Sequence, residues 1–317
     1  MNEIKKTDID DTKDDVAYVI PQKSAYSRTV NFWMSVFFLL LAFLIFLPIL
    51  LVIIISFSSD ESVTELGYSF FPKSFSLDSY RYIFHSGAYL FRAFFNSVFI
   101  TAAGTVMGLL FMCPMAYAVS RKDFGYRKPL LLFLMIPMMF SGGLVSAYMV
   151  NTQILHLRNS YPALILPGLC STWYIMIMRN YFRISIPDSL VEAAELDGCD
   201  PFQTFIWVVL PISQPVIVTV SVFQMFSYWS SWYPSLLYLD SNHTELYPLQ
   251  YVLVNMDKSI ERLSRDSQYI SGAIGYIPPA VTVRMVMVVI VILPIMILLP
   301  FFHRFLKNGM TIGAIKE

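Results

Sequence analysis

The sequence predicts an all-α membrane protein with six transmembrane helices. Hydrophobic residues make up 56% of the chain, charged residues make up only 14%, and the mean hydropathy is +0.59. Charges are cleared from long windows, such as those between Arg28 and Asp60 and between Arg92 and Arg121. A helix that crosses a bilayer needs about 20 apolar residues. Because a backbone in lipid must satisfy its own hydrogen bonds, spans of this kind are helices.

The stretches without charged residues divide the chain, from the N-terminus onward, into tails, loops and spans. Residues 1–31 have few apolar side chains and many acids and lysines, which is typical of a disordered, solvated tail. Loops are expected at 58–91 and 238–281, and a second tail at 304–317. The six spans are expected near residues 32–57, 93–119, 129–150, 161–180, 211–237 and 282–303.

Lysines and arginines in the short connections set the expected orientation in the cell membrane. Residues 121–128 carry four of them, which predicts that this connection is cytoplasmic. By alternation, both termini and residues 181–210 also lie in the cytoplasm, whereas the loops at 58–91 and 238–281 lie outside. The expected topology is therefore multi-pass with cytoplasmic termini.

Residues 185–211 form a polar connection on the predicted cytoplasmic side. Asp188 or Ser189 can accept hydrogen bonds from free backbone N–H groups and so cap a first short helix. Gly198 is expected to end it, because glycine adopts left-handed backbone at little cost. Such a hairpin either merely connects two spans or docks into a soluble partner, and its angular, polar character favours docking.

A second short helix is predicted directly after Gly198. Asp200 as N-cap and Pro201 in the first turn are typical of a helix start. Pro211 lacks an N–H group and is expected to block continuation of this helix. The fifth span is expected to begin at this proline.

Several kinds of chemistry have no matching pattern in the sequence. No Gly-Lys dipeptide occurs, so no Walker A loop for ATP is expected. The four histidines are isolated, which argues against a metal site. Cys113, Cys170 and Cys199 lack C-x-x-C spacing and are expected to be free. Ionisable residues are almost missing from the spans, which disfavours a proton-coupled transporter, and a net charge of zero suggests no nucleic-acid partner.

The cytoplasmic hairpin carries a specific pattern. Glu192-Ala193-Ala194 is followed by Asp197-Gly198 and, further on, by Leu210-Pro211. This arrangement resembles the EAA loop of ABC importer permeases, which in that family is a coupling helix seated in a cleft of the ATP-binding subunit. The resemblance implies that the following residues couple the chain to an ATPase: Glu192, Ala193, Ala194, Asp197, Gly198, Leu210 and Pro211.

Other stretches resemble the carbohydrate-uptake branch of these importers, of the maltose-permease G-subunit type. They are Asn96-Ser97, Ala116-Tyr117-Ala118, Tyr181-Phe182 and the final residues KNGMTIGAIKE. The resemblance covers about residues 92–317 and implies an ABC permease domain at 92–303. Departures from the family pattern are Asn180 in place of glycine, Cys199 where alanine is common, and Glu317 in place of glycine.

The resemblance also implies a division of labour. The chain would pair with a second homologous permease, two ATP-binding subunits and an extracellular solute-binding protein, and would carry a sugar or oligosaccharide across membrane lipid. ATP and Mg would bind to the partner subunits, so this chain would bind no cofactor and would not itself be an enzyme. Alternatives are an importer of phosphate, polyamine or peptide, a polytopic membrane enzyme, and a structural scaffold. The sugar-type tail favours saccharides.

Polar and aromatic residues gather in the fifth span. Gln224 and Tyr228 are one helical turn apart. An amide can bind sugar hydroxyls and an aromatic ring can pack on the C–H faces of a sugar, so this pair is a candidate for the substrate path. The alternative is that aromatic residues near the end of a span form the interfacial belt, which suits Trp232 and Tyr233.

Overall fold

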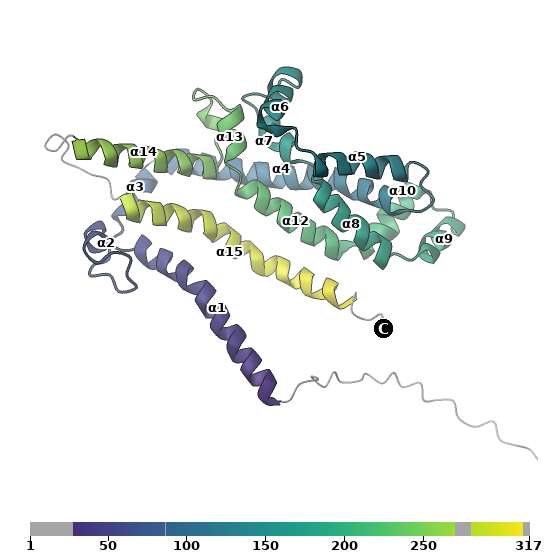
Figure 1. Ribbon diagram of the computed structural model, residues 1–317, viewed down its shortest axis with the longest axis horizontal. Coiled ribbons are helices and arrows are strands. Elements are labelled where there is room, and N and C mark those ends of the chain that lie inside the picture. Colours follow the sequence, from purple (N-terminus) through teal and green to yellow (C-terminus); the bar gives the residue numbers. More distant parts are fainter. Residues whose placement is uncertain (1–27, 86, 270–279, 313–317) are drawn as a thin grey trace, which may run out of the picture. The chain divides into compact units, whose positions relative to one another are not determined.

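The computed structural model describes residues 28–85, 87–269 and 280–312, and within these ranges the chain forms helices and connecting loops (Figure 1). No strand occurs in the described part, where a single isolated β-bridge joins Ser58 and Phe75. The all-α prediction is confirmed. The chain divides into two compact units, residues 1–50 and 51–317. Most of the predicted N-terminal tail, residues 1–27, lies outside the described residues.

The first predicted span is one helix, and the loop that follows it contains two short helices. Ser59 caps the first of these by accepting a hydrogen bond from the Ser62 N–H group at 3.2 Å. The next long helix begins at Gly87, earlier than the expected position 93, so the predicted loop at 58–91 is largely ordered structure. The bounds are α1 Arg28–Ser56, α2 Asp60–Leu66, α3 Asp78–His85 and α4 Gly87–Ser120.

The third predicted span is broken. Helix α5 (Arg127–Met139) is followed by α6 (Gly143–Met149) and the π-helical turn η1 (Val150–Ile154), with a bend of 118° between the two parts. Gly143 has φ of +79° at the start of α6, a left-handed backbone that favours glycine. The break therefore falls at a glycine pair that the sequence prediction had placed inside a continuous helix.

The fourth predicted span is also broken. Helix α7 (Tyr161–Ile165) continues as the 3-10 turn η2 (Leu166–Gly168), and α8 (Thr172–Ser185) follows after a bend of 49°. The fifth span is α12 (Gln214–Trp229), which stops before α13 (Tyr233–Tyr238) rather than running to residue 237 as one helix.

The predicted loop at 238–281 is mostly a helix. After the 3-10 turn η4 (Thr244–Leu246), α14 (Leu249–Tyr269) packs into the core through buried Val252, Leu253 and Ile260. Residues 270–279 lie outside the described residues. The last helix, α15 (Ala280–Ile312), continues beyond the expected end of the sixth span and into the tail expected at 304–317.

The number of helices suited to a bilayer agrees with the prediction of six spans. Three stretches are long and apolar enough alone: Thr29–Ser56, Gly87–Ser120 and Val281–Leu298. Three bent helix pairs pass the same test together, which gives up to six spans by length and composition. The third of these pairs joins Pro201–Ile212 to α12 at 80°.

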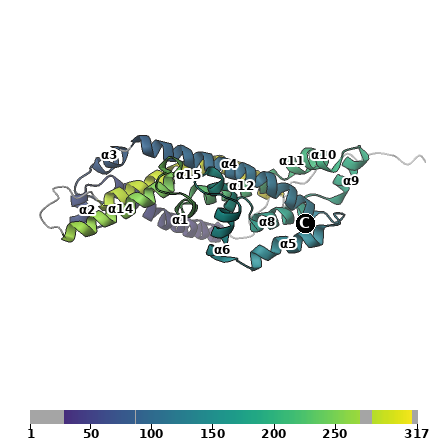
Figure 2. The same ribbon diagram turned by 90° about the horizontal axis from the view of Figure 1, so that it is seen from above.

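Two hydrophobic clusters form the core of the unit 51–317. One is built around Ile83, Ile100 and Val286, and the other around Met112, Met178 and Val209. Helices α4 and α12 contribute buried residues to both clusters, and Figures 1 and 2 show these two helices side by side. The second cluster supports the hairpin at 188–212, which is the candidate functional site.

Candidate functional site

The hairpin begins with α9 (Asp188–Leu196), and its start differs from the prediction. The N-cap is Pro187, and no side chain caps the helix, so the expected capping by Asp188 or Ser189 is wrong. The reason is a stronger partner for the carboxylate. Asp188 accepts a hydrogen bond from the Lys122 ammonium at 2.9 Å and lies 3.7 Å from the Arg121 guanidinium.

This ion-pair group joins the α4–α5 connection to α9. The hydrogen bond from Lys122, together with its positive charge and that of Arg121, lowers the pKa of Asp188 below its usual range. Arg121 also binds Asp123, at 2.9 Å. The negative charge of Asp188 in the first turn is also favourable for the helix dipole. The start of α9 is therefore held by charges that lie about 66 residues earlier in the chain.

The end of α9 agrees with the prediction. Gly198 has φ of +87°, in the left-handed region. The Cys199 N–H group donates to the Ala194 carbonyl at 3.0 Å, and the Gly198 N–H group donates to the Glu195 carbonyl at 3.0 Å. This pair of bonds is a Schellman motif, which satisfies carbonyls that a helix end would leave free. The chain thus turns sharply at Gly198 with its polar groups paired.

The second half of the hairpin starts as predicted and ends differently. Asp200 and Gln203 form a capping box on α10 (Pro201–Thr204), with the Gln203 N–H group donating to Asp200 at 2.7 Å. The π-helical turn η3 (Phe205–Val209) and α11 (Leu210–Ile212) follow. Helical structure therefore runs through Pro211, contrary to the expectation that this proline would stop it. The π turn directly before it already departs from the regular bonding that proline would interrupt.

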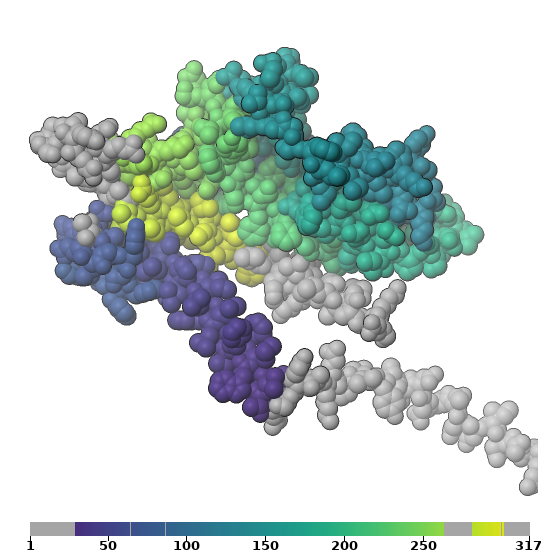
Figure 3. Space-filling view, viewed as in Figure 1, coloured from purple at the N-terminus to yellow at the C-terminus, as the bar shows by residue number. Residues whose placement is uncertain are grey.

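The hairpin has a buried face and an open face. Val191 and Ala194 are buried, and Val191 packs in the cluster that includes Phe205. Of the predicted coupling residues, Ala194 therefore faces the protein interior and Leu210 is half-buried. The exposed members of the set are Glu192, Ala193, Asp197, Gly198 and Pro211. In Figure 3 this segment forms the right-hand end of the coloured surface.

Three large apolar side chains on the hairpin were missed by the sequence analysis. Leu196, Phe202 and Trp207 are 89%, 70% and 75% exposed. Exposed apolar side chains grouped on a polar segment are typical of a docking surface. The sequence could have revealed them, because a hairpin surrounded only by water would carry polar residues at these three positions.

The predicted substrate-path residues are buried and bind backbone. The Gln224 amide donates to the Gly168 carbonyl at 2.9 Å, and the Tyr228 hydroxyl donates to the Ile165 carbonyl at 2.7 Å. Only 2% of Gln224 and 7% of Tyr228 is exposed. Both carbonyls belong to the segment where the fourth span breaks. Non-helical backbone at membrane depth must find partners within the protein or in water, and these two side chains supply them.

Close packing of α4 against α12 makes this arrangement possible. A Cβ atom built on Gly104 would lie 2.4 Å from the Tyr228 ring, and one on Gly108 would lie 2.7 Å from the Leu169 carbonyl oxygen. Small residues at helix interfaces allow such approach in membrane proteins. Among the described residues, a Cβ atom built on Gly142 would meet only Ser146, at 3.9 Å, and one built on Gly143 would meet nothing within 4 Å.

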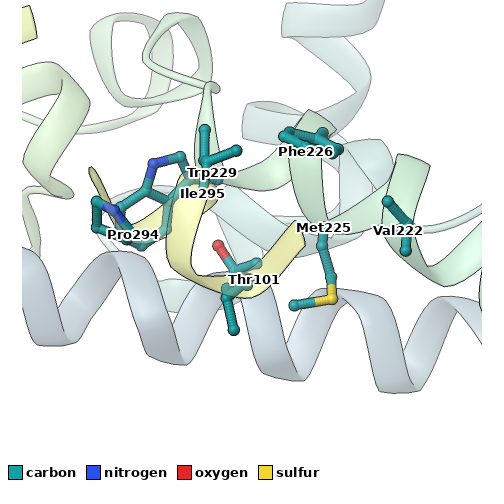
Figure 4. Close-up of a pocket in the computed structure, with 8 residues that line it drawn as sticks. Thr101, Val222, Met225, Phe226, Trp229, Pro294 and Ile295 are labelled. Atoms are coloured by element: carbon teal, nitrogen blue, oxygen red, sulfur yellow. The ribbon is translucent and has the colours of Figure 1, made fainter. Parts of the chain in front are cut away.

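A second contact of α12 lies near Pro294 in the last span. The Trp229 indole N–H group donates to the Val291 carbonyl at 3.1 Å. Pro294 has no N–H group, so the carbonyl of residue 290 lacks its regular helical hydrogen bond. The Val291 carbonyl that Trp229 binds is the next one along the helix. Trp229 and Pro294 are among the residues that line an apolar pocket of about 40 Å³ (Figure 4).

Several known proteins resemble this chain over most of its length. No protein-family model matches the chain. The chain is 34% identical to the polygalacturonan/rhamnogalacturonan transport system permease protein YtcP of Bacillus subtilis over 280 residues, which is 88% of this chain and 96% of that protein. It is 26% identical to the arabinooligosaccharides transport system permease protein AraQ of the same organism, over 93% of this chain and 98% of that protein.

A solved structure supports the same relationship. The chain matches a bacterial ABC transporter involved in the import of the acidic polysaccharide alginate with a TM-score of 0.73 and 26% identity, over 88% of this chain and 98% of that chain. The chain therefore belongs to the carbohydrate-uptake family of ABC importer permeases.

Proposed function

We propose that this chain is the membrane-spanning subunit through which an ATP-driven importer carries oligosaccharides into the cell. The observation that carries the proposal is the helical hairpin at 188–212, which exposes apolar side chains on a fold with up to six spans. The named relatives transport polygalacturonan or rhamnogalacturonan and arabinooligosaccharides, and the solved relative imports alginate. These substrates share a chain of sugar units, which favours an oligosaccharide over phosphate, polyamine or peptide.

The hairpin is suited to transmit force between subunits. Its open face offers Glu192, Ala193 and the apolar side chain of Leu196 to a partner. Its other face is fixed by buried Val191 and by the bond between Asp188 and Lys122. A displacement applied to α9 therefore moves the ends of α4 and α8 with it, which can bias the spans between two conformations.

The proposed complex contains a second homologous permease, two ATP-binding subunits and an extracellular solute-binding protein. ATP and Mg bind to the ATP-binding subunits, which supply the energy. Both termini and the hairpin lie in the cytoplasm, where ATP is available, and the basic 121–128 connection supports this orientation. The solute-binding protein delivers its sugar from the opposite side.

The substrate path is proposed to pass the broken fourth span. Gln224 and Tyr228 hold the carbonyls of Gly168 and Ile165 from one side. Pro167 and Cys170, which also lie at the break, are exposed. Lipid is an unsuitable neighbour for irregular backbone, whereas a water-filled cavity is suitable. In this proposal Gln224 and Tyr228 shape the path by fixing the break.

The test is uptake by the complete complex in proteoliposomes, with galacturonate and arabinose trisaccharides as probes. Glu192→Lys should reduce uptake about tenfold, which corresponds to the loss of one hydrogen bond to a charged group. The matched control is Glu61→Lys, which reverses an exposed acid on α2 and should transport normally. Sugar binding to the isolated solute-binding protein should be unchanged.

Two outcomes would contradict the proposal. If the wild-type complex transports phosphate, a polyamine or a peptide and neither trisaccharide, the substrate assignment is wrong. If Glu192→Lys transports as well as Glu61→Lys, the hairpin is not the coupling element.

A further inference from the structure

A polar cavity of about 280 Å³ lies where the end of α4, the end of α8 and the start of α9 meet. Figures 1 and 2 show α8 and α9 toward the end of α4 that is farther from α3. The cavity lies at the end of α8, away from the break between Gly168 and Thr172 in the same span, and none of its lining residues is among Glu192, Ala193 and Leu196 on the open face of the hairpin. Its lining includes three cations, Arg121, Lys122 and Arg183, and one carboxylate, Asp188.

Positive charge exceeds negative charge around this cavity. Asp188 binds Lys122 and Arg121, and Asp123 binds Arg121. Arg183 has no carboxylate at ion-pair distance within the described ranges. Arg179, one turn away on α8, is close enough to Arg183 and Arg127 for their charges to repel it. Cations that crowd a cavity without enough acids are stabilised by an added anion.

The surroundings of the cavity are apolar as well as basic. Ile184, which lies on its rim, is 74% exposed, and Phe182 and Ile186 also line it. The helices α4 and α8 belong to predicted spans that end at this level. A ligand that fits therefore has an anionic part for the arginines and an apolar part beside Ile184. Anionic phospholipids have this composition, and basic pockets between spans on the cytoplasmic side are known to hold their headgroups.

We propose that this cavity binds the phosphate headgroup of an anionic phospholipid from the cytoplasmic leaflet, with Arg183 and Lys122 as its main cations. The bound phosphate competes with Asp188 for Lys122, so lipid occupancy changes how firmly α9 is anchored. The inference rests on the membrane orientation proposed above. Under this proposal, the lipid composition of the membrane regulates the hairpin at 188–212.

The test is lipid retention by the complete complex, purified in detergent from membranes that contain phosphatidylglycerol. Bound lipid is quantified by mass spectrometry, without sugar or nucleotide, so failure of the transport proposal would not affect the result. Arg183→Gln should lower phosphatidylglycerol retention about fivefold, as expected for the loss of one cation near an anionic lipid. Arg92→Gln, which removes an exposed arginine at the other end of α4, should retain as much as the wild type.

A second variant gives a change of opposite sign. Asp188→Asn removes the competing charge and should raise phosphatidylglycerol retention above the wild type, which general damage to the cavity would not do. Equal retention by Arg183→Gln and Arg92→Gln would overturn the proposal, and so would a fall in retention with Asp188→Asn.

Two further outcomes would assign the cavity to another ligand. If inorganic phosphate at millimolar concentration displaces the phosphatidylglycerol, the cavity is a site for free anions. If Arg183→Gln keeps its lipid and instead loses the ATP-binding subunits, the cavity binds a carboxylate of that partner.

Discussion

Gly198 shows how a single backbone angle shapes the functional hairpin. Its φ is +87°, and a Cβ atom built there would meet no atom within 4 Å. A substitution is therefore opposed by backbone strain alone, about 1–2 kcal/mol for an ordinary side chain and more for a β-branched one. Strain of that size will not unfold the spans, but it can tilt α9 relative to a partner.

We predict that Gly198→Val gives membrane-inserted protein with strongly reduced uptake. Gly198→Asn is the matched variant, because asparagine tolerates left-handed backbone, and it should retain most of the wild-type uptake. Both are measured as sugar uptake and sugar-stimulated ATP hydrolysis in proteoliposomes. Equal activity of the valine and asparagine variants would show that the angle at residue 198 is not important for coupling.

At the same scale, local signals were predictable from sequence and distant partners were not. Gly198 and Asp200 act on residues within five positions of themselves, and both were identified correctly. Asp188 looked like a helix cap because its cationic partners at 121 and 122 are far away in the chain. For the same reason the sequence did not show that Gln224 and Tyr228 bind carbonyls more than 50 residues earlier. Their place beside the substrate path stays a prediction.

At the scale of elements, the contact between α4 and α12 depends on Gly104. We predict that Gly104→Ala lowers the free energy of unfolding by about 1–3 kcal/mol, because its Cβ would lie 2.4 Å from the Tyr228 ring. Gly87→Ala is the control, since a Cβ there meets nothing within 4 Å. Thermal unfolding of the purified complex measures both. If the two variants unfold at the same temperature, the helices can separate without cost and the close contact is not structural.

The existence and number of spans were predictable, whereas their breaks were not. Apolar windows identify a span because lipid requires them. The break in the third span falls at Gly142–Gly143, and the break in the fourth span directly follows Pro167–Gly168. Glycine and proline are also common inside continuous membrane helices. Whether such a residue breaks a helix depends on whether other elements satisfy the freed carbonyls, as α12 does here. Whether such partners exist depends on the tertiary structure, which the local sequence pattern does not reveal.

At the scale of the whole molecule, α4 and α12 connect the two parts of the mechanism. Both helices contribute to the cluster beside the broken fourth span and to the cluster under the hairpin. In the proposed function the first region handles sugar and the second receives force from ATP hydrolysis. Two packed helices shared by both regions offer a physical route for coupling, provided that their packing has two stable arrangements.

This arrangement requires that the hairpin and the α2–α3 region lie on opposite sides of the membrane, and cysteine labelling can test it. The free cysteines Cys113, Cys170 and Cys199 are first replaced by serine. Single cysteines are then placed at three exposed positions, Tyr68, Asn242 and Tyr126. Tyr68 and Asn242 lie in the two connections expected outside, and Tyr126 lies in the basic connection expected in the cytoplasm.

We predict that an impermeant maleimide added to intact cells labels Tyr68→Cys and Asn242→Cys but not Tyr126→Cys. Tyr126→Cys should become reactive once the membrane is permeabilised, because its position is as exposed in the fold as the other two, and this shows that the absence of labelling reflects the membrane barrier. Labelling of Tyr126→Cys in intact cells would place the 121–128 connection and the hairpin outside. The hairpin could then not reach an ATPase in the cytoplasm, and the proposed mechanism of coupling would fail even though the fold and the family remained.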